Sequence, residues 1–104
     1  MPKIAMCQAW DKNYQALADI TWTQNKKIYC DHWGYPYHIK TDGFTYVASY
    51  EKIKFMLDIM NEHPEYDWLY WAGCDTIITN MYIKLESFVD DNYHIIMAKD
   101  INNI

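Results

Sequence analysis

Glycine is scarce in this sequence, which has only three, at positions 34, 43 and 73. The chain contains neither the GxGxxG fingerprint of dinucleotide-binding folds nor the glycine-rich P-loop of nucleotide hydrolases. It also lacks the GxSxG turn that carries the serine of many hydrolases. These absences exclude three common motif-based enzyme classes.

Cysteine is equally scarce. Cys7, Cys30 and Cys74 are too few and too scattered for a disulfide framework, and their odd number leaves at least one thiol free. Reduced thiols fit a cytoplasmic location best. Cys30 with His32 and His38 gives a weak zinc pattern, but no CxxC or HxxxH spacing supports it.

Clustered positive charge is missing as well. The net charge is −5, and the longest basic run is Lys26-Lys27. Nucleic-acid binding needs a basic stripe, so we expect no nucleic-acid partner. The sequence also has no apolar span near the ~18 residues of a membrane helix, and no signal-peptide pattern at its start.

Apolar side chains are abundant, at 51% hydrophobic and 17% aromatic residues. A chain of 104 residues with this composition suits one packed domain, and it shows no linker, repeat or low-complexity segment. Strand-like and helix-like patterns alternate, which favours an α/β fold with a mainly parallel sheet of about four strands and flanking helices. We predict strands over residues 3–9, 35–39, 68–72 and 93–98, and helices over 13–29, 50–63 and 81–87.

Two of these segments have distinctive patterns. The strand over 68–72 is apolar throughout, which is typical of a strand covered on both faces of a parallel sheet. The helix over 50–63 has apolar residues at the spacing of a core-facing stripe. The stripe consists of Ile53, Met56, Leu57 and Met60.

A lone carboxylate, Asp75, follows the strand over 68–72. Ligands of open α/β sheets bind just beyond the carboxyl ends of the strands. Gly73 and Cys74 are small enough to let a diphosphate approach the backbone there. Mg²⁺ or Mn²⁺ takes one or two protein carboxylates and completes its coordination with phosphate and water. Asp75 is therefore a candidate metal ligand, and the alternative is an ordinary turn or helix-cap aspartate.

The loop after the first strand, Gln8 to Asp11, reaches the same edge of the predicted sheet. Trp10 or Tyr14 could stack on a nucleotide base there. A capped helix start with Trp10 half buried explains the same residues without a ligand. Lys52, early in the second long helix, could reach a phosphate, or it could simply lie in solvent as most lysines do.

Several of these residues together resemble glycosyltransferase family 34, the galactosyl-, mannosyl- and xylosyltransferases of the GT-A fold. The resemblance rests on Lys52, His63-Pro64, the aromatic run Trp68–Trp71 and the segment Cys74–Met81. It is good over roughly residues 50 to 98 and only general before them. The chain is also similar to a glycosyltransferase domain that large algal DNA viruses encode to modify their capsid glycans.

The resemblance implies a metal-dependent glycosyltransferase with a UDP-sugar donor, Mn²⁺ or Mg²⁺ as cofactor and a glycan or glycoprotein acceptor. Residues 1–104 would be its amino-terminal, Rossmann-like nucleotide-sugar-binding half, cut short near Ile104. A viral member would work in the host cytoplasm. The catalytic residues are not identified by the resemblance.

In this family a nucleotide-binding first loop matches Ala9, Trp10 and Asp11, a donor-contacting lysine matches Lys52, and the metal ligand matches Asp75. Gly73 stands where the family carries the first carboxylate of an Asp-x-Asp motif, so the contact of that carboxylate with ribose or metal-bound water is lost. The expected donor-binding residues are Ala9, Trp10, Asp11, Tyr14, Lys52, Gly73, Cys74 and Asp75, with Asp75 also as the metal ligand.

Two other hypotheses come from different classes. A nucleotidyltransferase that makes sugar nucleotides would need a glycine-rich, basic first loop, and Gln8 to Lys12 contains no glycine. A non-catalytic α/β binding or interaction module is the second, in which Gly73-Cys74 marks a lost active site.

Overall fold

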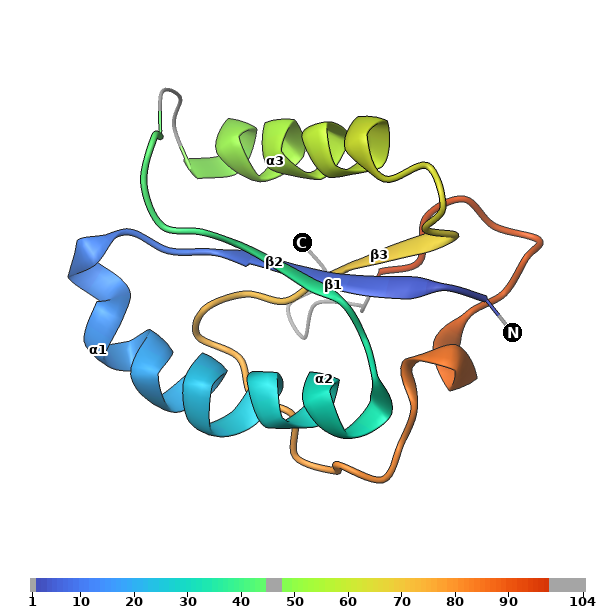
Figure 1. The fold of residues 1–104 in the computed structure, drawn as a ribbon, viewed down its shortest axis with the longest axis horizontal. Coiled ribbons are helices and arrows are strands. Elements are labelled where there is room, and N and C mark those ends of the chain that lie inside the picture. The colour runs from blue at the N-terminus through green and yellow to red at the C-terminus, as the bar shows by residue number, and fades with distance from the viewer. Residues whose placement is uncertain (1, 45–47, 98–104) are drawn as a thin grey trace.

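The computed structural model describes residues 2–44 and 48–97, which form a three-stranded sheet between two helical layers (Figure 1). Its strands are parallel and lie in the order β2-β1-β3. The predicted α/β class is confirmed. The strands are β1 (Ile4–Ala9), β2 (Tyr37–Lys40) and β3 (Trp68–Trp71).

The two helical layers are unequal. Helix α3 (Ala48–Glu62) alone covers one face of the sheet, and a longer helical run covers the other (Figure 1). A short 3₁₀ helix, η3 (Leu85–Phe88), follows β3. The long run consists of η1 (Lys12–Tyr14), α1 (Gln15–Ala18), η2 (Asp19–Lys26) and α2 (Lys27–Trp33).

Strand β1 is the buried centre of the sheet, and residues 4–8 are all buried. Met6 faces α2, where the Cys30 Sγ lies 3.7 Å from the Met6 Sδ. Cys7 points to the opposite face, within electrostatic reach of Lys52 on α3. The strand predicted over 3–9 is therefore confirmed, beginning one residue later.

The helix predicted over 13–29 is part of a longer run that ends at Trp33. Asp11 begins the run, because its side chain accepts a hydrogen bond from the Asn13 backbone N–H at 2.9 Å. Gly34 ends it with φ 75°, the left-handed conformation that glycine adopts without strain. The middle segment η2 has π-helical geometry, with backbone bonds from residue i to i+5.

The second strand begins later than predicted, at Tyr37 rather than at residue 35. Tyr35 is buried instead under η3, where its hydroxyl hydrogen-bonds to the Glu86 carboxylate and accepts from the Leu85 N–H at 3.0 Å. The chain turns into the sheet through Pro36, whose carbonyl accepts from the Met6 N–H at 2.9 Å.

Strand β3 is not covered on both faces, contrary to the prediction for residues 68–72. It pairs only with β1 within the described residues, and its side chains are half-buried or, at Tyr70, exposed. The sequence pattern was misleading because large aromatic rings on an edge strand give the same continuous apolar run as a central strand.

Most of the predicted apolar stripe of α3 does not face the core either. Ile53, Leu57 and Met60 are exposed and Met56 is half-buried, whereas Glu51 and Ile59 are buried. Two residues along a helix correspond to a rotation of about 200°, so Leu57 and Ile59 lie on opposite faces. The helix has apolar side chains on both faces, and periodicity alone could not distinguish them.

The segment after β3 contains less regular structure than predicted. Residues 81–84 form a turn and irregular backbone, and the 3₁₀ helix η3 forms near the helix predicted over 81–87. Tyr93 to Met97 is exposed and forms no strand, and Ala98, the last residue of that predicted strand, lies outside the described residues. A strand needs a neighbour to pair its backbone, and residues 93–97 pair with no strand of the described sheet. The sheet therefore has three strands here rather than about four.

Candidate functional site

A pocket of about 400 Å³ lies at the edge of the sheet where the parallel strands end. The Trp10 N–H donates to the Lys40 carbonyl at 3.1 Å, and the Ala72 N–H donates to the Cys7 carbonyl at 3.1 Å, so the three strand ends are held together. Seven of the eight predicted site residues line this pocket, and the eighth, Gly73, directly precedes Cys74. The lining residues are Ala9, Trp10, Asp11, Tyr14, Phe44, Glu51, Lys52, Trp71, Cys74 and Asp75.

The first loop supplies one wall. Trp10 is only 8% exposed, and its indole N–H donates to the Gln15 Oε1 at 2.8 Å. Tyr14 is 55% exposed and remains accessible to a ligand. Of the two aromatic residues considered for base stacking, Tyr14 is therefore the accessible one. Trp10 is part of the pocket wall, and it is buried rather than half-buried as the ligand-free alternative predicted.

The Gly73–Thr76 turn presents Asp75 to the pocket. The backbone N–H and the side-chain hydroxyl of Thr76 both donate to the Gly73 carbonyl, at 3.1 and 2.7 Å. The Asp75 side chain is exposed, while Cys74 is half-buried. Desolvation raises the pKa of the Cys74 thiol, which argues against Cys74 as a nucleophile.

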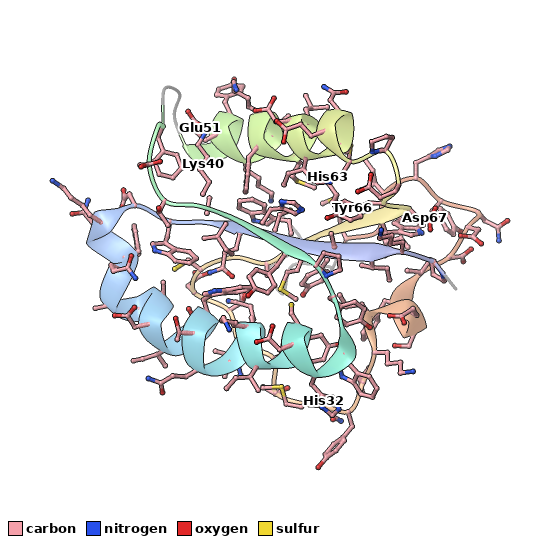
Figure 2. The ribbon with its side chains drawn as sticks, in the orientation of Figure 1. His32, Lys40, Glu51, His63, Tyr66 and Asp67 are labelled. Atoms are coloured by element: carbon pink, nitrogen blue, oxygen red, sulfur yellow. The ribbon has the colours of Figure 1, made fainter. Side chains whose placement is uncertain are left out.

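Helix α3 contributes the opposite wall. The Lys52 ammonium lies 5.4 Å from the centre of the Trp71 ring, a cation–π distance. Glu51 is buried and pairs with Lys40 at 3.2 Å, and Figure 2 shows both side chains at the amino-terminal end of α3. The site therefore combines acidic groups with a lysine at its rim.

Three lining residues were not among the predicted site residues. Glu51 directly precedes Lys52, and its position in the first turn of a helix beside the site could have pointed to it. Trp71 ends β3, so the same edge argument that selected Asp75 could have selected it. Phe44 lies in an irregular segment, where no periodic pattern marks it.

The residues present fit a divalent ion that a substrate helps to hold. No group of three His, Cys, Asp or Glu side chains in the described part of the chain could hold a metal alone. Asp75 is an accessible hard oxygen donor at the pocket, and Asp11 is a second carboxylate on its lining. Mg²⁺ and Mn²⁺ are commonly bound in this way, with substrate phosphates completing the coordination.

The profile of the galactosyl transferase GMA12/MNN10 family, glycosyltransferase family 34, matches residues 4–103. The chain belongs to this family. The membership predicted from the segment around Lys52 and Asp75 is thereby confirmed, and the match extends over the amino-terminal half as well.

The chain is also similar to one curated protein and to one solved structure. An uncharacterized alpha-1,2-galactosyltransferase of Schizosaccharomyces pombe is 25% identical over 87 residues, which are 78% of this chain and 25% of that protein. A solved glycosyltransferase involved in the glycosylation of the major capsid of PBCV-1 superposes with a TM-score of 0.72 at 16% identity, over 89% of this chain and 48% of the other. The fold is thus a glycosyltransferase fold. This family 34 chain spans a quarter and about half of the lengths of these two relatives.

No helix in residues 2–44 and 48–97 has both the length and the apolar composition needed to cross a membrane.

Proposed function

We propose that this chain is the donor-binding part of a GT-A glycosyltransferase that transfers a sugar from a nucleotide diphosphate, with UDP as the preferred nucleotide. The observation that carries the proposal is the pocket at the carboxyl edge of the parallel sheet, where Asp75, Lys52 and Tyr14 meet. This is the place where open α/β sheets bind nucleotides. Its size of about 400 Å³ is in the range of small-molecule sites.

Each wall has a separate task in this proposal. The exposed ring of Tyr14 stacks on the base, and the small side chain of Ala9 leaves room for the nucleotide. Lys52 offers a positive charge to the diphosphate, although it competes with its contact to Trp71. Asp75 holds Mn²⁺ or Mg²⁺, which supplies Lewis-acid stabilisation of the departing diphosphate when bound. The acceptor is a glycan or a glycoprotein.

The location we propose is cytoplasmic. Cys7, Cys30 and Cys74 are all free thiols. Free thiols persist in a reducing compartment.

The test is calorimetry of UDP binding with and without Mn²⁺. We expect Mn²⁺-dependent binding that weakens about 10- to 100-fold in Asp75→Asn, because the variant loses the charged metal ligand while keeping the side-chain shape. Asp31→Asn is the matched control, since Asp31 is an exposed carboxylate on α2 outside the pocket. Mn²⁺-independent binding, or equal binding in Asp75→Asn and wild type, would refute the proposed site.

A non-catalytic module is the second candidate, and Gly73 favours it because one carboxylate of the motif is absent. Slow hydrolysis of the UDP-sugar separates the two candidates, since a transferase site activates its donor even without an acceptor. Donor binding without any hydrolysis in the complete protein would favour the module.

A further inference from the structure

Lys26 is a buried lysine beneath the candidate site. Only 1% of it is exposed, and it lies at the end of η2, on the layer opposite α3. Its ammonium donates to the Gly73 carbonyl at 2.9 Å and to the Thr76 carbonyl at 2.5 Å, and it lies 3.4 Å from the Thr76 hydroxyl. All three acceptors belong to the turn that carries Asp75.

Burying an ammonium with uncharged acceptors is costly, because carbonyl oxygens replace only part of its hydration. Desolvation lowers the pKa of Lys26, and the neighbouring Cys74 and Asp75 act in the opposite direction. A packing role alone would be served better by an apolar side chain of the same length. The charge at this position therefore calls for another explanation.

Lys26 does not act alone. The Thr21 hydroxyl donates to the Cys74 carbonyl at 2.6 Å, so a second side chain of η2 holds the same turn. Asn25 makes two bonds to Ile78, donating to its carbonyl at 3.0 Å and accepting from its N–H at 2.7 Å. In π-helical geometry residues i and i+5 are about one turn apart, so Thr21 and Lys26 share the face that meets the loop.

We propose that Lys26 is a positioning residue of the donor site, which fixes the Gly73–Thr76 turn so that Asp75 faces the pocket. Thr21 and Asn25 hold the same loop through Cys74 and Ile78, and we call these three side chains of η2 the clamp. The inference rests on the proposed function of Asp75 as a metal ligand. The inference explains how Asp75, the single carboxylate of the motif, is kept in place. In a two-carboxylate motif a second metal ligand would help to fix the loop, and here the hydrogen bonds from η2 fix it instead.

The test compares Lys26→Met with Lys27→Met in the full chain. Methionine keeps the unbranched shape and removes the charge, and Lys27 is the adjacent lysine, whose ammonium pairs with Asp31 at 3.0 Å outside the pocket. UDP binding in the presence of Mn²⁺ is measured by calorimetry well below both unfolding midpoints, and hydrogen exchange is measured at the amides of residues 73–78. We expect the Mn²⁺-dependent affinity for UDP to fall about 10- to 100-fold in Lys26→Met only, with faster exchange in the loop.

The outcomes are distinct. If Lys26→Met is less stable but binds UDP with Mn²⁺ like wild type, Lys26 is a structural residue and the inference is wrong, while the proposed function stands. If UDP binding to wild type does not depend on Mn²⁺, the proposed metal site fails and the role of Lys26 fails with it. If Lys26→Met does not fold, Thr21→Val removes the hydroxyl that bonds to the Cys74 carbonyl at 2.6 Å and lies 3.1 Å from the Leu17 carbonyl in its own helix. Unchanged Mn²⁺-dependent UDP affinity in that variant would overturn the inference.

Discussion

Gly73 stands where the resemblance to family 34 leads us to expect the first carboxylate of an Asp-x-Asp motif, and its surroundings show whether a carboxylate fits there. Its backbone is not in the left-handed region, which the positive-φ glycines Gly34 and Gly43 occupy. A Cβ at Gly73 would lie 3.0 Å from the Asp75 Oδ1, so the Asp75 side chain would have to move slightly. Backbone strain therefore does not require glycine here, and an aspartate could be restored.

We expect Gly73→Asp to strengthen Mn²⁺ binding by about tenfold, because a second carboxylate joins Asp75 at one ion. Without metal the variant should be less stable than wild type, since two like charges then face each other. Calorimetry with Mn²⁺ and thermal unfolding with and without a chelator measure both effects. Gly73→Asn has the same size without the charge, and equal Mn²⁺ affinity in the two variants would contradict the expectation.

The three cysteines differ in burial. Burial raises the pKa of the Cys7 and Cys30 thiols to about 12, although Lys52 opposes the shift at Cys7. Cys74 is half-buried at the pocket. At pH 8 we expect a thiol-specific disulfide reagent to modify only Cys74 in the native protein, and all three cysteines in denaturant. Peptide mapping identifies the modified residue, and native modification of Cys30 would contradict the buried environment.

At the scale of elements, helix α3 was predicted correctly as a helix, but the face predicted to be buried in the core was wrong. Its predicted stripe and its buried face both contain apolar residues, but three of the four stripe residues are exposed, whereas Ile59 is buried. Glu51 is on the buried side as well, where its pairing with Lys40 offsets the cost of burying a carboxylate.

Alanine substitutions on the two faces of α3 test this assignment. Ile59 is 3% exposed and Leu57 is 53% exposed. We expect Ile59→Ala to lower the free energy of unfolding by about 2–5 kcal/mol, because it leaves a cavity, and Leu57→Ala to change it by about 0.5 kcal/mol or less. Urea unfolding measures both values, and the opposite ranking would restore the stripe predicted from periodicity.

At the scale of the whole molecule, a cluster of rings joins the sheet to the end of α3. His38 on β2 lies 4.7 Å from His63, measured between ring centres, and its Nε2 is 2.9 Å from the Tyr66 hydroxyl. His63 in turn pairs with Glu65 at 2.9 Å. Figure 2 shows His63 and Tyr66 together between the helix and the sheet, with His32 in the opposite layer.

This cluster makes stability depend on pH. Desolvation, with a smaller contribution from His63, lowers the pKa of His38 below its ordinary 6.5, while Glu62 and Glu65 oppose the shift. The unfolded chain therefore takes up this proton first, and stability falls as the pH drops below 6.5, until the folded pKa is passed. We expect His38→Gln to flatten this slope in urea unfolding between pH 7.5 and pH 5.5. His32→Gln, at an exposed site, should keep the wild-type slope, and an unchanged slope in His38→Gln would refute the assignment.

The sequence by itself determined much of the local structure and which residues line one pocket at the edge of the sheet. The buried strand from Ile4, the helix begun by Asp11 and the segment from Trp68 to Asp75 are local patterns, since spacing, capping and apolar runs act between near neighbours. Parallel strands meet at one edge, so Ala9 and Asp75 could be placed at the same pocket before any coordinates. Whether these residues bind a nucleotide sugar stays a prediction that the proposed binding experiments test.

Only the tertiary structure decided which apolar surfaces are covered. The edge position of β3, the outward stripe of α3 and the exposed segment from Tyr93 to Met97 depend on which neighbour is present, and a single segment does not encode its neighbour. The same holds for Lys26. In the sequence it is half of an ordinary Lys26-Lys27 pair, and it becomes a buried clamp because the loop after β3, about 50 residues later, places its carbonyl groups against it.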